Sequence, residues 1–204
     1  NSAVAYYDGI LANPIRLIIF SGLFVLATTY IVAKGVGKGL ERSTRWMMPA
    51  LFVILTALLL YAMITGEFAK ALAFMFVPDF TKIAAAVALT AFGQAFFSLG
   101  IGLGVMLTYG AYMPKEASIV KSSVTIALAD GLVAIVAGLA IFPIVFQYNL
   151  SPTEGPGLIF MTLPIAFGQM PGGSYVGALF FVLLAFAALS SSISLLESII
   201  SRLE

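Results

Sequence analysis

The sequence predicts an all-helical integral membrane protein, and two observations support that prediction. Hydrophobic residues make up 61% of the 204 residues, charged residues only 9%, and the mean hydropathy is +1.09. Soluble domains carry about a quarter charged residues. The charges also divide the chain into apolar runs that are each long enough to cross a bilayer as a helix, which takes about 20 residues. We therefore expect membrane-spanning helices to account for most of the chain.

Five helices are expected, placed by the charges that bound them. Four of the runs contain no charged residue, and one contains a single charge, Asp130. The expected helices cover residues 15–36, 46–64, 83–112, 117–147 and 176–203. All of them belong to one transmembrane region, residues 1–204.

The third expected helix, 83–112, should break at mid-membrane, near 98–104. Three glycines stand at alternate positions close to its centre: Gly100, Gly102 and Gly104. Each interior glycine costs a helix about 1 kcal/mol relative to alanine. Broken backbone at membrane depth is tolerated only where it is buried in protein or lines a wet cavity. The break therefore predicts a binding site whose polar members are Gln94, Ser98 and freed backbone groups.

Lysine and arginine orient these helices, because cytoplasmic loops carry an excess of both. One side collects seven of the ten basic residues: Lys34, Lys38, Arg42, Arg45, Lys115, Lys121 and Arg202. The other side has Arg16, Lys70 and Lys82. We expect the first side to be cytoplasmic, and residues 1–14, 65–82 and 148–175 to lie outside.

The outer connection at 148–175 is rich in proline and glycine, with an apolar stretch at 158–170. Short helices that dip toward the membrane fit this composition. Two interpretations stay open, a compact surface hairpin and an outer lid over a pathway.

Three polar sites are expected at one depth. Ser98 lies 14 residues before the cytoplasmic turn at 112–117, and Asp130 lies 13 residues after it. At 1.5 Å per residue both stand roughly 20 Å from that turn, near mid-membrane. The serine run at 190–192 falls at the middle of the last helix. Helix packing by small residues is the alternative for the serines, but the shared depth favours a cation site.

Asp130 is the most informative single residue. A carboxylate at the bilayer centre costs about 3 kcal/mol and usually faces a cavity or a partner. The chain has no His and no Cys, so oxygen ligands remain, and these suit a hard cation such as sodium. A proton relay and a hydrogen-bonded structural aspartate are the alternatives. Glu197, nearer the interface, is expected to be a structural or gating acid.

The composition also bears on function classes. Without His and Cys, thiolate catalysis, histidine bases and the usual zinc sites are excluded. The net charge of +1 gives no sign of nucleic-acid binding. We expect neither an enzyme nor a cofactor; a membrane enzyme that uses Asp130 and Glu197 is the alternative. Residue 1 is Asn and no cleavage signal is present, so an internal piece of a longer protein is expected.

Several motifs resemble the neurotransmitter:sodium symporter family, in particular its bacterial amino-acid transporters of the leucine-transporter type. Gly-Gln-Ala-Phe-Phe-Ser-Leu at 93–99, followed by Gly102, Gly104, Tyr109 and Tyr112, resembles the family's unwound sixth helix. Ala-Ala-Leu-Ser-Ser-Ser at 187–192 resembles its eighth helix, and Gly-Pro-Gly-Leu at 155–158 its re-entrant outer loop. The resemblance covers helices four to eight, and it implies the inverted-repeat transporter fold known from this family itself.

The resemblance also implies a site. Ser98 and Asp130 would help to hold one sodium ion, and the Ala187 carbonyl with the Ser190 and Ser191 hydroxyls would hold part of a second. The residues lining the amino-acid pocket would be Phe97, Ser98, Gly100, Gly102, Leu103, Met106, Ser191 and Leu195. The gating residues would be Gln94, Phe97 and Tyr112. Gly39 and Pro49 resemble a motif at which some relatives unwind the fifth helix; the simpler interpretation is a helix end and a first-turn proline.

The implied function is secondary active transport: sodium-coupled uptake of an amino acid by a multi-pass protein of the bacterial or archaeal plasma (inner) membrane. Chloride independence is expected, because Asp130 supplies a fixed negative charge and Ala134 stands where chloride-dependent relatives place a serine. A proton-coupled transporter of the same fold and a non-transporting membrane scaffold are the alternatives. The implied partners are the amino acid, sodium ions, the lipid bilayer and the missing helices of the parent chain.

Overall fold

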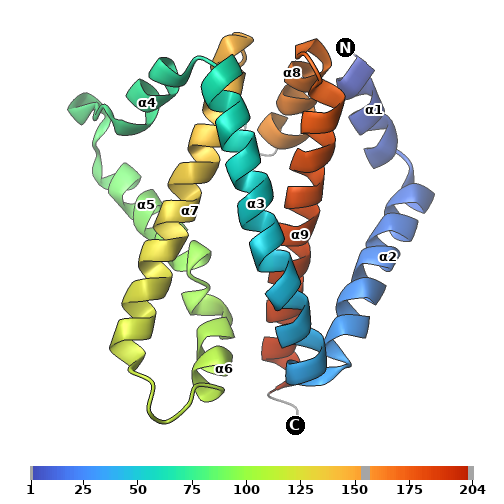
Figure 1. Cartoon of the computed structure of the whole chain (residues 1–204), viewed down its shortest axis with the longest axis vertical. Helices are drawn as coiled ribbons and strands as arrows, with labels where there is room; N and C mark the ends of the chain where they lie inside the picture. Colours follow the sequence, from blue (N-terminus) through green and yellow to red (C-terminus); the bar gives the residue numbers. More distant parts are fainter. Residues whose placement is uncertain (1, 153–156, 202–204) are drawn as a thin grey trace.

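The computed structural model describes residues 2–152 and 157–201, and these residues form helices joined by short connections (Figure 1). Expectations that fall on Gly155, Pro156 and Arg202 lie outside the described residues. Within them, four helical segments are long and apolar enough to cross a membrane. These are α2 (Pro14–Val32), the continuous segment Val36–Thr65 formed by η1 (Val36–Glu41) and α3 (Arg42–Thr65), α7 (Ile119–Gln147) and α9 (Gly173–Ile200).

Shorter helices complete the described fold. In chain order they are α1 (Ser2–Leu11), α4 (Phe68–Phe76), η2 (Phe80–Lys82), α5 (Ala85–Ser98), η3 (Ile101–Leu103), α6 (Val105–Ala111), η4 (Leu158–Thr162) and α8 (Leu163–Gln169). Figure 1 places α1, α4 and α8 at one end of the molecule, while α6 and the C-terminal end of α9 lie at the other.

The structure divides the expected helix at 83–112 into two helices, and the gap between them falls at the expected break near 98–104. α5 ends at Ser98 and α6 begins at Val105, and neither is long enough to cross a bilayer alone. Gly100 and Gly104 have φ angles of 65° and 77°, in the left-handed region that favours glycine. The described residues therefore hold four continuous membrane-length helices, and α5 and α6 occupy the range of the fifth expected helix.

Other helix ends differ where the expected ranges followed charges. α2 ends at Val32 rather than 36, because the chain turns at Gly35, whose φ is 74°. The next helix is continuous back to Val36 through a π-helical turn, so Gly39 lies inside a helix and does not end one. Charged side chains mark the membrane boundary, whereas backbone hydrogen bonds continue the helix beyond it.

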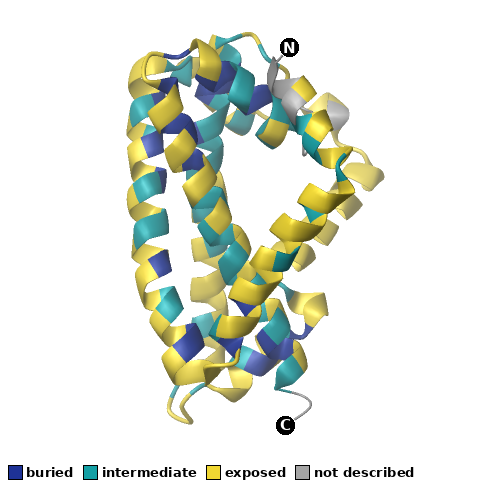
Figure 2. Cartoon of the chain, turned by 90° about the vertical axis from the view of Figure 1, so that its right-hand side faces the viewer, coloured by how far each residue is buried: buried dark blue, intermediate teal, exposed yellow. Residues whose placement is uncertain are grey.

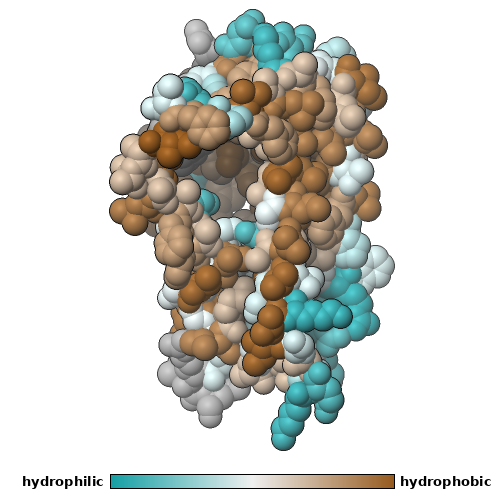
Figure 3. Space-filling model, turned by 90° about the vertical axis from the view of Figure 1, so that its left-hand side faces the viewer, coloured by the Kyte–Doolittle hydropathy of each residue, from teal (hydrophilic) through white to brown (hydrophobic). Residues whose placement is uncertain are grey.

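Buried residues gather toward the two ends of the molecule (Figure 2). One cluster, which includes Ala62, Ile144, Leu163 and Phe180, joins α3, α7, α8 and α9. A smaller cluster around Val32, Leu40 and Ile193 joins α2, η1 and α9. Between the ends, apolar side chains are exposed (Figure 3). This surface is typical of helices that face lipid or further helices.

Gly173 allows α9 to begin in close contact with α8. A Cβ at this position would lie 1.7 Å from the Phe167 carbonyl oxygen, a distance that no side chain can occupy. Gly172, the N-cap of α9, has a φ of 67° and makes the turn between the two helices. The short connection therefore depends on both glycines.

We predict that Gly173→Ala destabilises the protein by about 1–3 kcal/mol, because the added methyl group forces α8 away from α9. The melting temperature of the full-length protein in detergent measures this. Gly168→Ala is the matched control, since a Cβ there meets nothing within 4 Å. Equal melting temperatures for the two variants would contradict the close contact.

Candidate functional site

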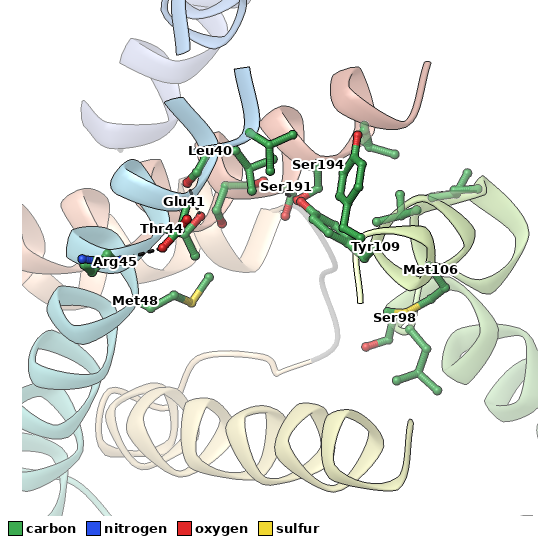
Figure 4. Close-up of a pocket in the computed structure, with 18 of the residues that line it drawn as sticks. Leu40, Glu41, Thr44, Arg45, Met48, Ser98, Met106, Tyr109, Ser191 and Ser194 are labelled. Atoms are coloured by element: carbon green, nitrogen blue, oxygen red, sulfur yellow. Dashed lines mark hydrogen bonds and ion pairs between the residues drawn. The ribbon is translucent and has the colours of Figure 1, made fainter. Parts of the chain in front are cut away.

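A cavity of about 1050 Å³ lies between three parts of the fold (Figure 4). On one side it is lined by η1 and the start of α3, with Leu40, Thr44 and Met48. On the other side lie the end of α5, the turn after it, and α6. In Figure 4, Ser191 and Ser194 of α9 stand between these walls. The lining thus combines apolar side chains with a few hydroxyl groups.

The cavity collects most of the residues that the sequence singled out. Nine of them line it: Phe97, Ser98, Gly100, Leu103, Met106, Tyr112, Ser190, Ser191 and Leu195. The other four do not line it: Gln94, Gly102, Asp130 and Ala187. Two of these four form hydrogen bonds with lining residues, Asp130 with Ser98 and Ala187 with Ser190.

The Ser98 hydroxyl donates to both carboxylate oxygens of Asp130, at 2.8 and 2.7 Å. Ser98 is the last residue of α5, and Asp130 lies within α7. The left-handed turn at Gly100 ends α5 next to the carboxylate, so this end of the helix contributes backbone carbonyls that lack helical partners. A hydroxyl, a carboxylate and carbonyls are the oxygen groups that hard cations bind.

The serine run of α9 divides between two tasks. The Ser190 hydroxyl donates to the Ala187 carbonyl at 2.9 Å, and Ser190 and Ser191 line the cavity. Ser192 instead shares a hydrogen bond of 3.1 Å with Thr28 of α2, which is only 3% exposed. Helix packing is therefore the right account of Ser192, while its two neighbours face the cavity.

Two tyrosines fasten α6 to α9 beside the cavity. The Tyr109 hydroxyl shares a hydrogen bond of 2.8 Å with Ser194, and the Tyr112 hydroxyl donates to Glu197 at 2.8 Å. Glu197 is 6% exposed. These pairs were not predicted, although the sequence contains a signal for them. The two tyrosines are three residues apart, and so are their two partners, so the pairs repeat on one face of each helix.

The wall formed by η1 and α3 was also not predicted. Glu41 and Arg45, at the expected cytoplasmic boundary, line the cavity and form an ion pair of 2.6 Å. Charges at a helix end are ordinarily solvated, so no sequence signal distinguished this pair. Among the described residues there is no group of three or more acidic, His or Cys residues that could hold a metal ion. A cation bound here would therefore depend on neutral oxygens as well as on carboxylates.

Comparisons with known proteins agree on one family. A family model described as the sodium:neurotransmitter symporter family matches residues 14–204. The uncharacterized sodium-dependent transporter YhdH of Bacillus subtilis is 39% identical over 199 residues, which cover 98% of this chain and 44% of that protein. An uncharacterized sodium-dependent transporter of Haemophilus influenzae is 35% identical over 200 residues, with the same shares of 98% and 44%.

The fold is also similar to a solved structure, the crystal structure of MhsT in complex with L-phenylalanine. The TM-score is 0.85 and the sequence identity 44%, over 96% of this chain and 45% of that one. The chain thus spans less than half the length of the curated relatives named here and of MhsT.

We predict that Tyr112→Phe lowers the free energy of unfolding by about 1–2 kcal/mol, because the buried Glu197 loses a hydrogen-bond donor. Thermal unfolding of the full-length protein measures the loss. Tyr175→Phe serves as the control, since Tyr175 is 81% exposed. The assignment fails if both variants unfold at the temperature of the wild type.

Proposed function

The chain belongs to the sodium:neurotransmitter symporter family, and we propose that its parent protein is a sodium-coupled amino-acid symporter that does not need chloride. This family consists of sodium-dependent membrane transporters rather than enzymes. The observation that carries the proposal is the hydrogen-bonded pair of Ser98 and Asp130 at the end of a broken helix beside the cavity.

We assign α5 and α6 together to a fifth membrane crossing that is interrupted between them. In Figure 1 they follow one another from the end that carries α4 toward the opposite end. Buried Thr108 and the two tyrosines attach α6 to α9. Irregular backbone between the two helices is acceptable at this depth because it lines the cavity.

Sodium binding is assigned to two groups of oxygens. Ser98 and Asp130 supply ligands to one ion, and the Ala187 carbonyl with the Ser190 and Ser191 hydroxyls supplies ligands to the other. The carboxylate of Asp130 provides the fixed negative charge that makes chloride unnecessary, and Ala134 on the same helix offers no hydroxyl to bind it. Proton coupling through Asp130 is the second candidate, because an intramembrane carboxylate also serves proton transfer.

The substrate is assigned to the cavity. MhsT was solved with L-phenylalanine, and an amino acid fits a cavity whose side chains include Phe97, Leu103, Met106 and Leu195. The irregular backbone around Gly100 and Gly102 is assigned to the charged ends of the substrate, and Gly100 itself lines the cavity. A substrate carboxylate that completes a sodium shell couples the two, because each ligand then raises the affinity for the other equally.

Gating is assigned to the two ends of the same region. The outer gate is assigned to Phe97, which lines the cavity, and to Gln94, which lies one turn earlier on α5. The inner gate is assigned to Tyr112, which lines the cavity and donates to Glu197. The remaining ligands of both ions come from other helices of the parent protein. We place that protein in the plasma (inner) membrane of a bacterium or archaeon, consistent with its bacterial relatives.

We predict that Asp130→Asn abolishes sodium-driven amino-acid uptake into vesicles or makes it depend on chloride, because the fixed charge beside the ion is lost. Uptake of radiolabelled amino acids by the full-length protein is measured with a sodium gradient or a proton gradient alone. Thr90→Val, a matched polar change on α5 where the hydroxyl donates only to its own helix, should leave the ion dependence unchanged. If a proton gradient drives uptake without sodium, and Asp130→Asn abolishes that uptake, the coupling ion is a proton and not sodium.

The interrupted crossing predicts opposite accessibility of its two ends. Cysteines introduced as Thr81→Cys and Lys115→Cys should react with a membrane-impermeant maleimide from opposite sides of the membrane in a cysteine-free background. Lys38→Cys is the control for the side that carries Lys115. If both cysteines are labelled from the same side, α5 and α6 do not form a membrane crossing.

A further inference from the structure

A second cavity, of about 800 Å³, lies against the connection between α2 and α3. Three of its lining residues are cations, Lys34, Lys38 and Arg42, and two are exposed aromatic residues, Tyr30 and Trp46. We call this set the basic pocket. It shares no lining residue with the central cavity. The segment formed by η1 and the start of α3 therefore has a different cavity on each of its two faces.

The basic pocket carries positive charge that the described part of the chain does not neutralise. Two ion pairs form among the described residues, Arg45 with Glu41 and Lys70 with Glu67. Neither of them involves a cation of the basic pocket. Glu41 belongs to the lining of the central cavity instead. The Lys34 ammonium lies 3.9 Å from the centre of the Tyr30 ring, a cation–π contact that orients it without cancelling its charge.

Backbone geometry brings these cations together. A Cβ at Gly39 would lie 2.0 Å from the Ile31 carbonyl oxygen, so only glycine lets η1 press against the end of α2. The reversal at Gly35, with φ of 74°, returns the chain to that contact. Lys38 and Arg42 consequently lie on the same side of the connection as Lys34, although the chain reverses direction at Gly35, between Lys34 and Lys38.

The aromatic residues place the pocket at a membrane interface. Trp46 is 77% exposed and Tyr30 64% exposed. Tyr30 lies in the last turn of α2, and Trp46 lies near the start of α3, ten residues into the continuous segment Val36–Thr65. Tryptophan and tyrosine are enriched where acyl chains meet headgroups, and basic residues gather on the cytoplasmic side. The pocket thus combines cations for an anionic group with aromatic surface for the lipid beneath it.

We propose that the basic pocket binds the phosphate headgroup of an anionic phospholipid in the cytoplasmic leaflet. Lys34, Lys38 and Arg42 supply the positive charge that the headgroup needs, and Tyr30 and Trp46 contact the glycerol and upper acyl region. Basic pockets between membrane helices select anionic headgroups because zwitterionic lipids carry a compensating positive charge. The bound headgroup contacts one face of η1 and the start of α3, and the opposite face of the same segment lines the central cavity. The proposal does not depend on the ion or substrate assignments.

Quenching of Trp46 fluorescence by brominated lipids tests this site in the full-length protein in nanodiscs. A Trp46→Phe variant is measured in parallel, and subtracting its emission isolates that of Trp46. At equal and low mole fractions, brominated phosphatidylglycerol should quench Trp46 more than brominated phosphatidylcholine. The double variant Lys38→Gln/Arg42→Gln should reduce this preference by about tenfold, because each cation near an anionic headgroup contributes a severalfold factor.

The matched control is Lys115→Gln/Lys121→Gln, which removes two exposed cations from the same expected side of the membrane but outside the pocket. It should retain the preference for phosphatidylglycerol. Three outcomes would overturn the proposal: equal quenching by both lipids, an equal loss in both double variants, or loss of the preference on addition of inorganic phosphate. The last would identify a site for soluble anions. Amino-acid uptake driven by sodium is measured separately, so a failure here leaves the proposed transport function untouched.

Discussion

Main-chain hydrogen bonding in an apolar surrounding is the constraint on which this structure depends. Away from its ends, a continuous helix satisfies its own backbone groups, as α9 does between Gly173 and Ile200. Between Ser98 and Val105 the chain is not a continuous α-helix, because it makes left-handed turns at Gly100 and Gly104. Such an interruption requires other polar groups nearby. The Ser98–Asp130 pair and the cavity beside it occupy that place.

The two halves of the interrupted segment are held differently. α6 is attached to α9 through Tyr109 and Tyr112, whose hydroxyls reach Ser194 and Glu197. The end of α5 meets α7 through Ser98 alone among the hydrogen bonds found in the described residues. Among the described residues, more hydrogen bonds therefore hold α6 to the rest of the fold than hold the end of α5.

The connection between α2 and α3, with the start of α3, separates the basic pocket from the central cavity. Gly39 allows η1 to lie against α2, which builds the basic pocket on one face, while Leu40 and Thr44 on the other face line the central cavity. A ligand on the outer face therefore touches the same helical turns that shape the inner one.

The sequence alone predicts the membrane class and the long helices, because hydropathy and charge act locally along the chain. It also indicated the interruption, since three alternate glycines weaken any helix. Only the tertiary structure decided that Ser192 packs against Thr28, 164 residues away, and that Tyr112 reaches Glu197, 85 residues away. It alone brought Lys34, Lys38 and Arg42 into one pocket. These contacts depend on how each helix is rotated against its neighbours, and apolar helices of nearly uniform hydropathy carry little information about their rotation.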